Sequence, residues 1–231
     1  MTPRAGIIFA AGLGTRMGAL TRERPKALIE VAGRPLIDHA LALYRAAGVA
    51  RIVVNTHAHA EQIHAHLARV APETRISFEP RLLETGGGLR NALPLLGPGP
   101  VFTLNADMVW GGENPCLALA AAWDAARMDA LLCLVPRAAA RGHSGAGDFH
   151  RAAAGRLTRR GAAPSANFVY AGAGILGADA LRGLGEGAYS LNAVWEPILA
   201  AGRMSGTVHQ GLWVDVGRPE GVALAEAALA R

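Results

Sequence analysis

The sequence predicts an α/β fold: one domain, residues 1–231, built around a mixed and mainly parallel sheet. The first reason is that short apolar runs rich in β-branched residues alternate with amphipathic segments from residue 6 to residue 135. Such alternation is typical of right-handed βαβ units, whose strands run parallel. The second reason is that residues 148–176 change to short β-like pieces, which indicate an antiparallel addition to the sheet. A 51% hydrophobic content over this length is sufficient for one large core.

The first elements follow this alternation closely. Apolar runs predict strands at residues 6–12, 51–55 and 75–79, and amphipathic runs predict helices at residues 35–48 and 60–70. In residues 35–48 the apolar side chains recur at helical spacing, with a proline in the first turn and a glycine at the end. Strands joined by helices of this length are expected to lie parallel in one sheet.

The later elements are expected to extend the sheet and cover it. Two more apolar runs make five parallel strands by residue 135, with the additions at residues 100–107 and 129–135. Amphipathic runs predict helices at residues 87–96, 116–128 and 191–202. The chain then predicts a hairpin in residues 204–216 and a final helix.

Composition limits the classes of partner. The net charge is +5 and no block of like charges occurs, so we expect no nucleic-acid partner, although a positive balance suits an anionic small substrate. No run of 18 apolar residues and no signal-peptide pattern occur, so we expect no membrane association. Cys116 and Cys133 form no CxxC pair, which favours a reducing compartment and a cytoplasmic protein. A monomer or small homo-oligomer is expected.

A glycine-rich segment, "IIFAAGLGTRMG", follows the first predicted strand. In such a loop the backbone N–H groups approach phosphates that side chains would otherwise hold away. The dinucleotide pattern G-x-G-x-x-G fails, because the sixth position counted from Gly12 is Met17. The Walker A pattern fails as well, because no Gly-Lys-Ser/Thr follows. The segment therefore predicts a phosphate ligand without either of these two nucleotide motifs.

Lys26, in "RERPKALIE", is the only lysine in a chain with 23 lysine and arginine residues. An ammonium group is compact and carries three donors, whereas a guanidinium is a planar fork. A solvated surface lysine is the common fate of this residue type. A single lysine among so many arginines favours instead a position at which the shape of the cation matters.

The segment "GLGTRMGALTRERPKALIEVAGRPLI" resembles the signature of the nucleotide-sugar pyrophosphorylases, roughly G-x-G-T-R, L-T, P-K, a valine and a final proline. The residues in register are Gly12, Gly14, Thr15, Arg16, Leu20, Thr21, Pro25, Lys26, Val31 and Pro35. The sequence departs from the pattern at residues 17–19, where many members have a proline before the leucine. The resemblance implies a Rossmann-like fold of the nucleotide-diphospho-sugar transferase type.

The resemblance also implies a reaction: a sugar 1-phosphate attacks the α-phosphorus of a nucleoside triphosphate and releases pyrophosphate. Because two anions must meet, catalysis consists mainly of positioning and charge neutralisation. By the same resemblance Arg16 clamps the outer phosphates, and Lys26 lies between the α-phosphate and the sugar phosphate. Arg16, Lys26 and Asp107 are therefore the expected catalytic residues.

Two aspartates are expected to bind Mg²⁺. Asp107 ends the predicted strand "VFTLNAD", at the carboxyl edge of the sheet where ligands bind. Asp215 stands in "WVDVGRP", which is similar to the family's late motif W-x-D-x-G-x-P. Taken singly, each residue is equally well interpreted as a turn or capping aspartate. Together with the N-terminal signature they predict a hard-oxygen Mg²⁺ site completed by waters and phosphates.

The base and sugar positions follow from "LETGGG" and "GHSGAGDF", which look most like the compact N-acetylmuramate 1-phosphate uridylyltransferases of cell-wall recycling. UTP is then the expected nucleotide, with a flexible glycine loop reading its base. The resemblance implies nucleotide contacts at Ala11, Gly12, Gly14, Thr15, Arg16, Lys26, Glu84, Thr85, Gly86, Gly87 and Asn105. It implies sugar contacts at Asp148, Gly172 and Asn192. The family's E-K-P sugar segment is missing, and no residue is assigned in its place.

Two alternatives remain open from the sequence. One is a mannose- or glucose-1-phosphate guanylyltransferase or thymidylyltransferase, enzymes whose base loops differ from "LETGGG". The other is a catalytically silent nucleotide-sugar sensor on the same fold. The presence of Arg16, Lys26, Asp107 and Asp215 counts against the sensor.

Overall fold

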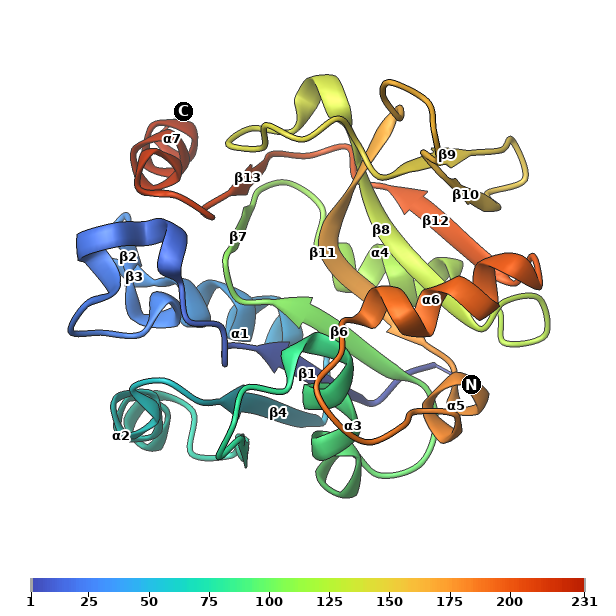
Figure 1. Ribbon diagram of the computed structural model, residues 1–231. Helices are drawn as coiled ribbons and strands as arrows, with labels where there is room; N and C mark the ends of the chain where they lie inside the picture. Colours follow the sequence, from blue (N-terminus) through green and yellow to red (C-terminus); the bar gives the residue numbers. More distant parts are fainter. Residues whose placement is uncertain (1, 231) are drawn as a thin grey trace.

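The computed structural model describes residues 2–230 and contains one large sheet with helices on both faces. Strand β1 (Ala5–Phe9) lies at the centre of the parallel half of this sheet. It pairs in parallel with β4 (Arg51–Thr56) on one side and with β6 (Val101–Asn105) on the other, and β5 (Arg75–Phe78) extends this half beyond β4. The predicted α/β fold with a mainly parallel mixed sheet is confirmed (Figure 1).

The second half of the sheet contains the antiparallel addition. Strand β11 (Phe168–Leu176) lies antiparallel between β6 and β8 (Ala130–Pro136), and β12 (Met204–Val208) pairs in parallel with β8. The fifth predicted parallel strand, β8, therefore runs in the same direction as β6 but is separated from it by β11. A small antiparallel pair, β9 (Phe149–Arg151) and β10 (Leu157–Arg159), joins the sheet at the start of β11.

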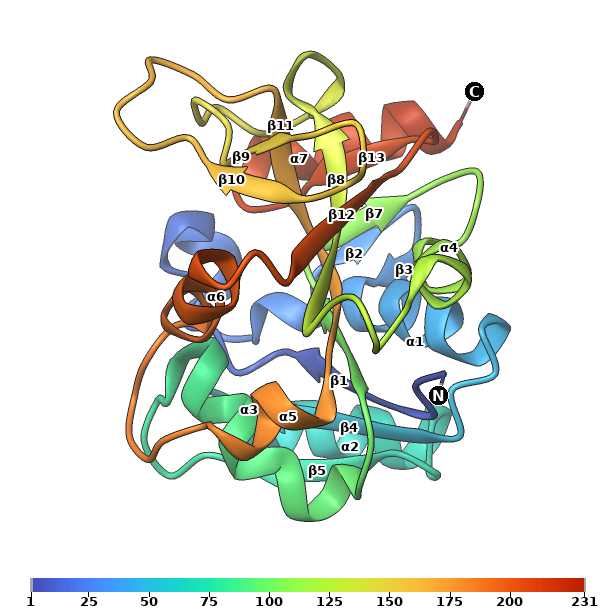
Figure 2. The same cartoon turned by 90° about the vertical axis from the view of Figure 1, so that its right-hand side faces the viewer.

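Alternation along the buried strands divides the core between the two faces of the sheet. Ile8 and Ile7 are both fully buried but belong to different apolar clusters, as successive side chains of a strand must. The Ile8 face is covered by α1 (Leu36–Ala46), α2 (Ala60–Val70) and α4 (Pro115–Ala122). The Ile7 face is covered by α3 (Glu84–Leu96), α5 (Ala178–Arg182) and α6 (Leu191–Ala200). Figure 2 shows α3, α5 and α6 on one side of the sheet and α1 and α4 on the other.

A third apolar cluster joins the two ends of the chain. Its buried residues include Met17, Val109, Val214 and Ala225. It packs the 3-10 helix η1 (Thr15–Thr21) and the β2–β3 hairpin (Glu30–Val31 and Arg34–Pro35) against the C-terminal elements. Those elements are β13 (Trp213–Asp215), which pairs with β7 (Met108–Trp110), and helix α7 (Pro219–Leu229). Figure 1 shows α7 in red beside the blue N-terminal segment.

Three local predictions are wrong. Residues 204–216 do not form a hairpin, because β12 pairs with β8 while β13 pairs with β7 in a separate sheet. The helix predicted at residues 116–128 ends at Ala122, where Trp123 turns to an extended conformation. The segment 84–87, expected as a flexible loop, is the first turn of α3.

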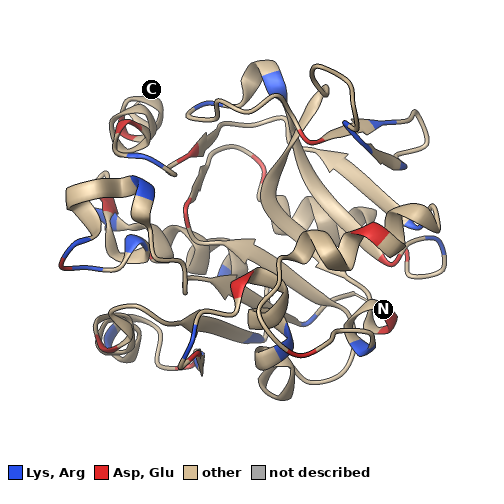
Figure 3. Cartoon of the chain, viewed as in Figure 1, with Lys and Arg blue, Asp and Glu red and all other residues tan. Residues whose placement is uncertain are grey.

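Charged side chains are spread over most of the elements. Figure 3 shows Lys and Arg mixed with Asp and Glu along the chain, and neither kind is concentrated on one group of elements. Two short 3-10 helices, η2 (Lys26–Leu28) and η3 (Arg137–Ala139), complete the elements of residues 2–230. Within the same residues no helix has the length and apolar character needed to cross a membrane.

Candidate active site

The glycine-rich segment leaves the carboxyl end of β1 and turns into η1. Gly14 adopts a φ of +64°, a left-handed conformation that glycine adopts without steric cost. A Cβ atom at Gly14 would lie 3.0 Å from Cβ of Lys26 and 2.9 Å from Cγ2 of Thr21. Gly12 has no heavy atom within 4 Å of its Cβ position, so its backbone borders open space. The turn therefore packs against the stem of Lys26 and leaves room for a ligand at Gly12.

A cavity of about 370 Å³ lies at the carboxyl edge of the parallel strands. Its lining combines the end of β1, the segment after β5, and the turn after β6. The lining residues are Phe9, Ala10, Ala11, Gly12, Lys26, Ala27, Asn55, Leu82, Glu84, Thr85, Asn105, Ala106, Asp107 and Ser190. Of the predicted nucleotide residues, it brings together Ala11, Gly12, Lys26, Glu84, Thr85 and Asn105; it excludes Gly14, Thr15, Arg16, Gly86 and Gly87. We call it the nucleotide-side cavity.

Lys26 and Asp107 meet inside this cavity. Lys26 follows Pro25, whose extended backbone leads into η2, and its Nζ donates a hydrogen bond to Oδ2 of Asp107. The side chain of Lys26 is 12% exposed and that of Asp107 is 23% exposed. The pair is partly shielded from water, so its mutual attraction exceeds that of a surface pair. A cation and an anion are thus held at the wall of an open cavity.

Asp215 is brought beside Asp107 by strand pairing. Strand β13 runs antiparallel to β7 with Asp215 opposite Met108, the residue that follows Asp107. The backbone N–H of Val216 donates to the carbonyl of Asp107 at 3.0 Å. Asp215 is further fixed by its own N–H, which donates to the carbonyl of Arg141 at 2.9 Å. The two predicted metal ligands, far apart in sequence, are neighbours in the fold.

The Asp215 carboxylate is partly buried, and one of its oxygens lacks a hydrogen-bond partner among residues 2–230. Burial raises the pKa of Asp215 above its ordinary value, and the charge of Asp107 raises it further, whereas Lys26, Arg16 and His143 lower it. Nδ1 of His143 lies 3.9 Å from Oδ2 of Asp215. Oδ1 of Asp215 is buried and has no hydrogen-bond partner among residues 2–230. A buried, unpartnered carboxylate oxygen beside a second carboxylate is suited to a divalent cation.

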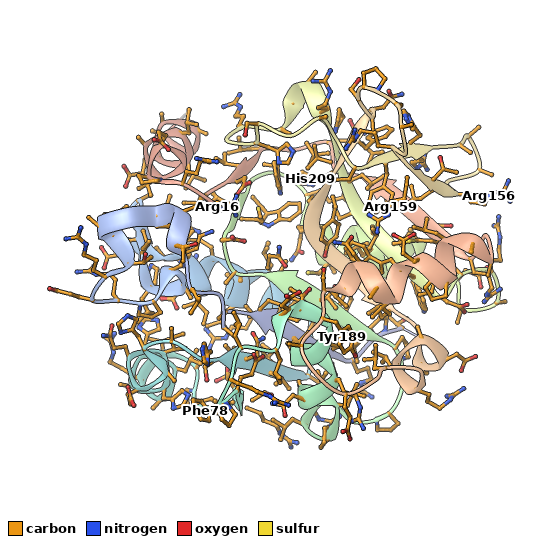
Figure 4. The ribbon with its side chains drawn as sticks, in the orientation of Figure 1. Arg16, Phe78, Arg156, Arg159, Tyr189 and His209 are labelled. Atoms are coloured by element: carbon orange, nitrogen blue, oxygen red, sulfur yellow. The ribbon has the colours of Figure 1, made fainter. Side chains whose placement is uncertain are left out.

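Gly217 keeps the space around that oxygen open. A Cβ atom at Gly217 would lie 2.7 Å from Oδ1 of Asp215 and 3.3 Å from Nη2 of Arg16. Arg16 therefore reaches the Asp215 side of the site from η1 and lies outside the nucleotide-side cavity. Arg16 is labelled in Figure 4. Within residues 2–230 no group of three or more His, Cys, Asp or Glu side chains is arranged to hold a metal. A divalent ion here would need oxygens from water or phosphate beyond the two carboxylates.

The predicted base loop is more ordered than expected. Its residues begin α3, and Glu84 adopts a left-handed φ of +58° at the cavity wall. The N–H groups of Gly86 and Gly87 both donate to the carbonyl of Tyr189, at 2.8 and 3.1 Å. A Cβ atom at Gly87 would lie 2.1 Å from the carbonyl oxygen of Gly187. These two glycines allow close backbone packing, so the flexible loop predicted for them is wrong, while Glu84 and Thr85 remain at the cavity.

Two residues not expected at the site, Asn55 and Glu79, connect the glycine-rich segment to residues 79–83, which lead into α3. Oδ1 of Asn55 accepts the N–H of Ala10 at 2.7 Å, and Nδ2 of Asn55 donates to Oε1 of Glu79 at 2.8 Å. Oε2 of Glu79 accepts the N–H of Leu83 at 2.9 Å. Glu79 is 0% exposed and Asn55 is 2% exposed. Asn55 is the penultimate residue of β4, and Glu79 directly follows β5. Both stand at the carboxyl ends of parallel strands, where ligands bind, and this position in the sequence could have pointed to them.

A second cavity of about 200 Å³ lies beside the first and shares Thr85, Asn105 and Ser190 with it. Of the predicted sugar residues, Asp148 and Asn192 line this second cavity, whereas Gly172 lines neither cavity. Gly172 lies at the irregularity in β11, where a Cβ would be 3.1 Å from Cβ of Asn105. We call this second space the sugar-side cavity.

Comparisons with known proteins show that the chain is a nucleotidyltransferase and give its family. Residues 6–210 match the MobA-like NTP transferase domain, so the chain belongs to this family. An N-acetylmuramate alpha-1-phosphate uridylyltransferase from Caulobacter vibrioides is 43% identical over 99% of this chain and 98% of its own length. A protein of the same name from Neisseria meningitidis serogroup B is 33% identical, covering 91% of this chain and 92% of its own.

Solved structures agree on the fold. HddC from Yersinia pseudotuberculosis, complexed with GMP-PN, has a TM-score of 0.78 at 18% identity and covers 99% of this chain and 100% of its own. A putative glucose-1-phosphate thymidylyltransferase from Bacillus anthracis has a TM-score of 0.80 at 16% identity, covering 98% of this chain and 95% of its own. NTP transferases of this family generally use a divalent metal, which suits the paired carboxylates.

Proposed function

We propose that the chain, as a single nucleotidyltransferase domain over residues 1–231, transfers the uridylyl group of UTP to N-acetylmuramic acid 1-phosphate. The products are a UDP-sugar and pyrophosphate, Mg²⁺ is the metal, and the reaction belongs to cytoplasmic cell-wall recycling. The observation that carries the choice of substrate is 43% identity to a uridylyltransferase of this specificity over 99% of this chain and 98% of the relative. Similarity over both full lengths covers the sugar side as well as the nucleotide side.

The nucleotide is bound between the glycine-rich segment and the start of α3. Backbone N–H groups of the glycine-rich segment approach the phosphates. Ala11 and Gly12 line the cavity and lie near the ribose and base, as the open space at Gly12 permits. Glu84 and Thr85 face the same cavity and are the base-side contacts. The hydrogen-bonded pair of Asn55 and Glu79 fixes the distance between these two walls.

Lys26 carries the central role in the transfer. An anionic oxygen of the sugar phosphate attacks the α-phosphorus, and the bond from that phosphorus to the pyrophosphate oxygen breaks. Pyrophosphate leaves with the bonding electrons, and the protein removes no proton because the attacking oxygen is already ionised. Lys26 donates N–H groups to oxygens of both converging phosphates, which its compact ammonium permits. Its ion pair with Asp107 holds it at this position before substrate binds.

The carboxylates and Arg16 complete the neutralisation of charge. Asp107 and Asp215 would hold Mg²⁺, and the unpartnered Oδ1 of Asp215 supports this assignment. When bound, the ion offsets negative charge on the triphosphate oxygens as they react. Arg16 lies on the Asp215 side of the site and binds the outer phosphates. Asn105 lies where the two cavities meet, and Asp148 and Asn192 orient the sugar.

The test is a substrate matrix that measures pyrophosphate release. UTP, GTP, CTP and dTTP are each combined with the 1-phosphates of N-acetylmuramic acid, N-acetylglucosamine, glucose and mannose, with Mg²⁺. We expect the highest kcat/KM for UTP with N-acetylmuramic acid 1-phosphate. Preference for GTP or dTTP with a hexose phosphate would replace this function with a guanylyltransferase or thymidylyltransferase. Absence of pyrophosphate release in every combination would support a sensor instead.

A further inference from the structure

One positively charged side chain, that of Arg159, lines the sugar-side cavity. Its lining residues are Thr85, Asn105, Asp148, Phe149, Arg159, Tyr170, Ser190, Leu191, Asn192 and Trp195, of which only Asp148 and Arg159 carry charge at neutral pH. Oδ2 of Asp148 accepts the backbone N–H of Tyr170 at 2.8 Å, so one of its oxygens is committed to β11. Arg159 is therefore the one cationic side chain among the lining residues, and it faces this cavity together with one carboxylate, Asp148.

Arg159 is held rigidly between the β9–β10 pair and α6. Its guanidinium carbon lies 4.8 Å from the ring centroid of Phe149 and 5.7 Å from that of Trp195. Nε donates to Oε1 of Glu196 at 2.9 Å, and Nη2 donates to Oδ1 of Asn192 at 2.8 Å. Aromatic contacts and two directed hydrogen bonds fix the plane of the guanidinium. Figure 4 labels Arg159 in this position beside α6.

The guanidinium of Arg159 keeps hydrogen-bond donors that no residue in the range 2–230 uses. Nη1 of Arg159 makes no hydrogen bond with any residue in the range 2–230. The side chain of Glu196 is 60% exposed, against 29% for Arg159, and Glu196 does not line the cavity. An ion pair with so exposed a carboxylate adds little net attraction and does not use all the donors of Arg159. The remaining donors of Arg159 are therefore available to a second anion that enters the sugar-side cavity.

We propose that Arg159 binds the carboxylate of the lactyl ether on the sugar 1-phosphate and thereby selects a muramic sugar over sugar 1-phosphates that lack this carboxylate. This inference rests on the proposed function. A guanidinium binds a carboxylate through directed, charge-assisted hydrogen bonds, and a preorganised one loses little entropy in doing so. Arg159 thus provides a cationic contact for the carboxylate of the sugar, separate from the sugar contact that the missing E-K-P segment leaves unassigned.

The neighbouring arginine provides a matched control. Arg160 follows Arg159 directly, and successive side chains of an extended chain point to opposite faces. Arg160 is exposed, and its Nη1 donates only to the carbonyl of Ala163 at 3.0 Å. It does not line the sugar-side cavity. Arg160→Gln removes the same charge from the same short segment without altering the cavity.

The experiment compares three acceptors with UTP: N-acetylmuramic acid 1-phosphate, the methylamide of its lactyl carboxylate, and N-acetylglucosamine 1-phosphate. KM and kcat are measured for wild type, Arg159→Gln, Arg159→Lys and Arg160→Gln. Arg159→Gln is expected to raise KM for the acid about 10- to 100-fold, the loss expected for a charge-assisted hydrogen bond. KM for the two acceptors without the lactyl carboxylate, and all kcat values, should change by no more than about twofold.

Arg159→Lys keeps the charge and the aliphatic stem, so it is expected to lose less affinity for the acid than Arg159→Gln does. Arg160→Gln should match wild type with every acceptor. Equal KM increases for all three acceptors, or equal effects of the two Gln variants, would overturn the role of Arg159 while leaving the proposed function intact. A wild-type protein that releases pyrophosphate only with other sugar phosphates would overturn the proposed function itself.

Discussion

Lys26 and Asp107, which lie 81 residues apart in sequence, form an ion pair at the wall of the nucleotide-side cavity. Lys26 enters from the N-terminal segment, and Asp107 enters from the turn after β6. The β7–β13 pair places a second carboxylate, that of Asp215, beside Asp107. Its ion-pair partner, Nδ1 of His143, is 3.9 Å away, farther than Lys26 is from Asp107. A single ammonium thus lies between the glycine-rich segment, which we propose binds phosphate, and two carboxylates, which we propose bind the metal.

Asp107→Asn and Asp215→Asn test the metal site. Each variant is expected to lower kcat about 10²- to 10³-fold and to require more Mg²⁺ for half-maximal activity, because one hard anionic ligand is lost. The check is a Mg²⁺ titration of pyrophosphate release, with EDTA as the metal-free control. Unchanged Mg²⁺ dependence in both variants would remove these residues from the metal site.

Asp215→Asn has a second expected effect, on stability. Burial raises the pKa of Asp215, so its ionised form is disfavoured in the folded protein without metal. The neutral isostere removes that cost, so Tm in EDTA at pH 7 should rise. A clear fall in Tm would show that the carboxylate stabilises the metal-free fold.

Glu79→Gln tests the polar link between the two walls of the nucleotide-side cavity. Both carboxylate oxygens of Glu79 accept N–H groups, and a glutamine replaces one acceptor by a donor. We expect a loss of about 1–3 kcal/mol in the free energy of unfolding, since a buried donor loses its partner. KM for UTP should rise as well. Glu61→Gln, on the exposed side of α2, is the control and should change neither quantity.

Gly12→Ala and Gly87→Ala are a pair of identical changes with opposite expectations. At Gly12 the added Cβ meets nothing within 4 Å, so Tm should be unchanged while KM for UTP rises, because the methyl group occupies space proposed for the nucleotide. At Gly87 it would lie 2.1 Å from a backbone carbonyl, so overpacking should cost about 1–3 kcal/mol of stability. Urea unfolding and steady-state kinetics of both variants separate the two roles. Equal stability losses would contradict the distinction.

Both cysteines are expected to be inert in the folded protein. Burial raises the pKa of Cys133 to about 12 and raises that of Cys116 further. At pH 8 neither side chain forms the reactive thiolate, and neither is accessible to a reagent. A thiol-reactive chromogenic disulfide should therefore detect no thiol until guanidinium is added, when it should detect two. Rapid reaction of either thiol without denaturant would contradict the buried placement.

The sequence was informative where a residue's position followed from short-range patterns. Lys26 and Asp107 stand at fixed places relative to a loop and a strand end, so the motif and the apolar run were sufficient to place both at the edge of the sheet. The same holds for the parallel direction of β1, β4, β5 and β6. Asp215 was identified by its motif, although the strand it was expected to form a hairpin with pairs elsewhere.

Features that depend on long-range contact were not predictable in this way. Local turn signals favoured a hairpin in residues 204–216, but the free edge of β8 and the β7 strand each pair with one half of it. Gly86 and Gly87 indicated flexibility in sequence, yet their function in the fold is to admit Tyr189 and the backbone of Gly187. The role of Glu79 becomes evident only from its burial and its hydrogen bond with Asn55.

Replacement of Lys26 tests the central claim most directly. Lys26→Ala and Lys26→Arg are compared with wild type for kcat of pyrophosphate release from UTP and N-acetylmuramic acid 1-phosphate, with circular dichroism as the check on folding. We predict that Lys26→Ala lowers kcat about 10²- to 10³-fold with native spectra. Because the shape of the cation matters, Lys26→Arg should not restore wild-type turnover. A folded Lys26→Ala enzyme with near-wild-type kcat would contradict the mechanism.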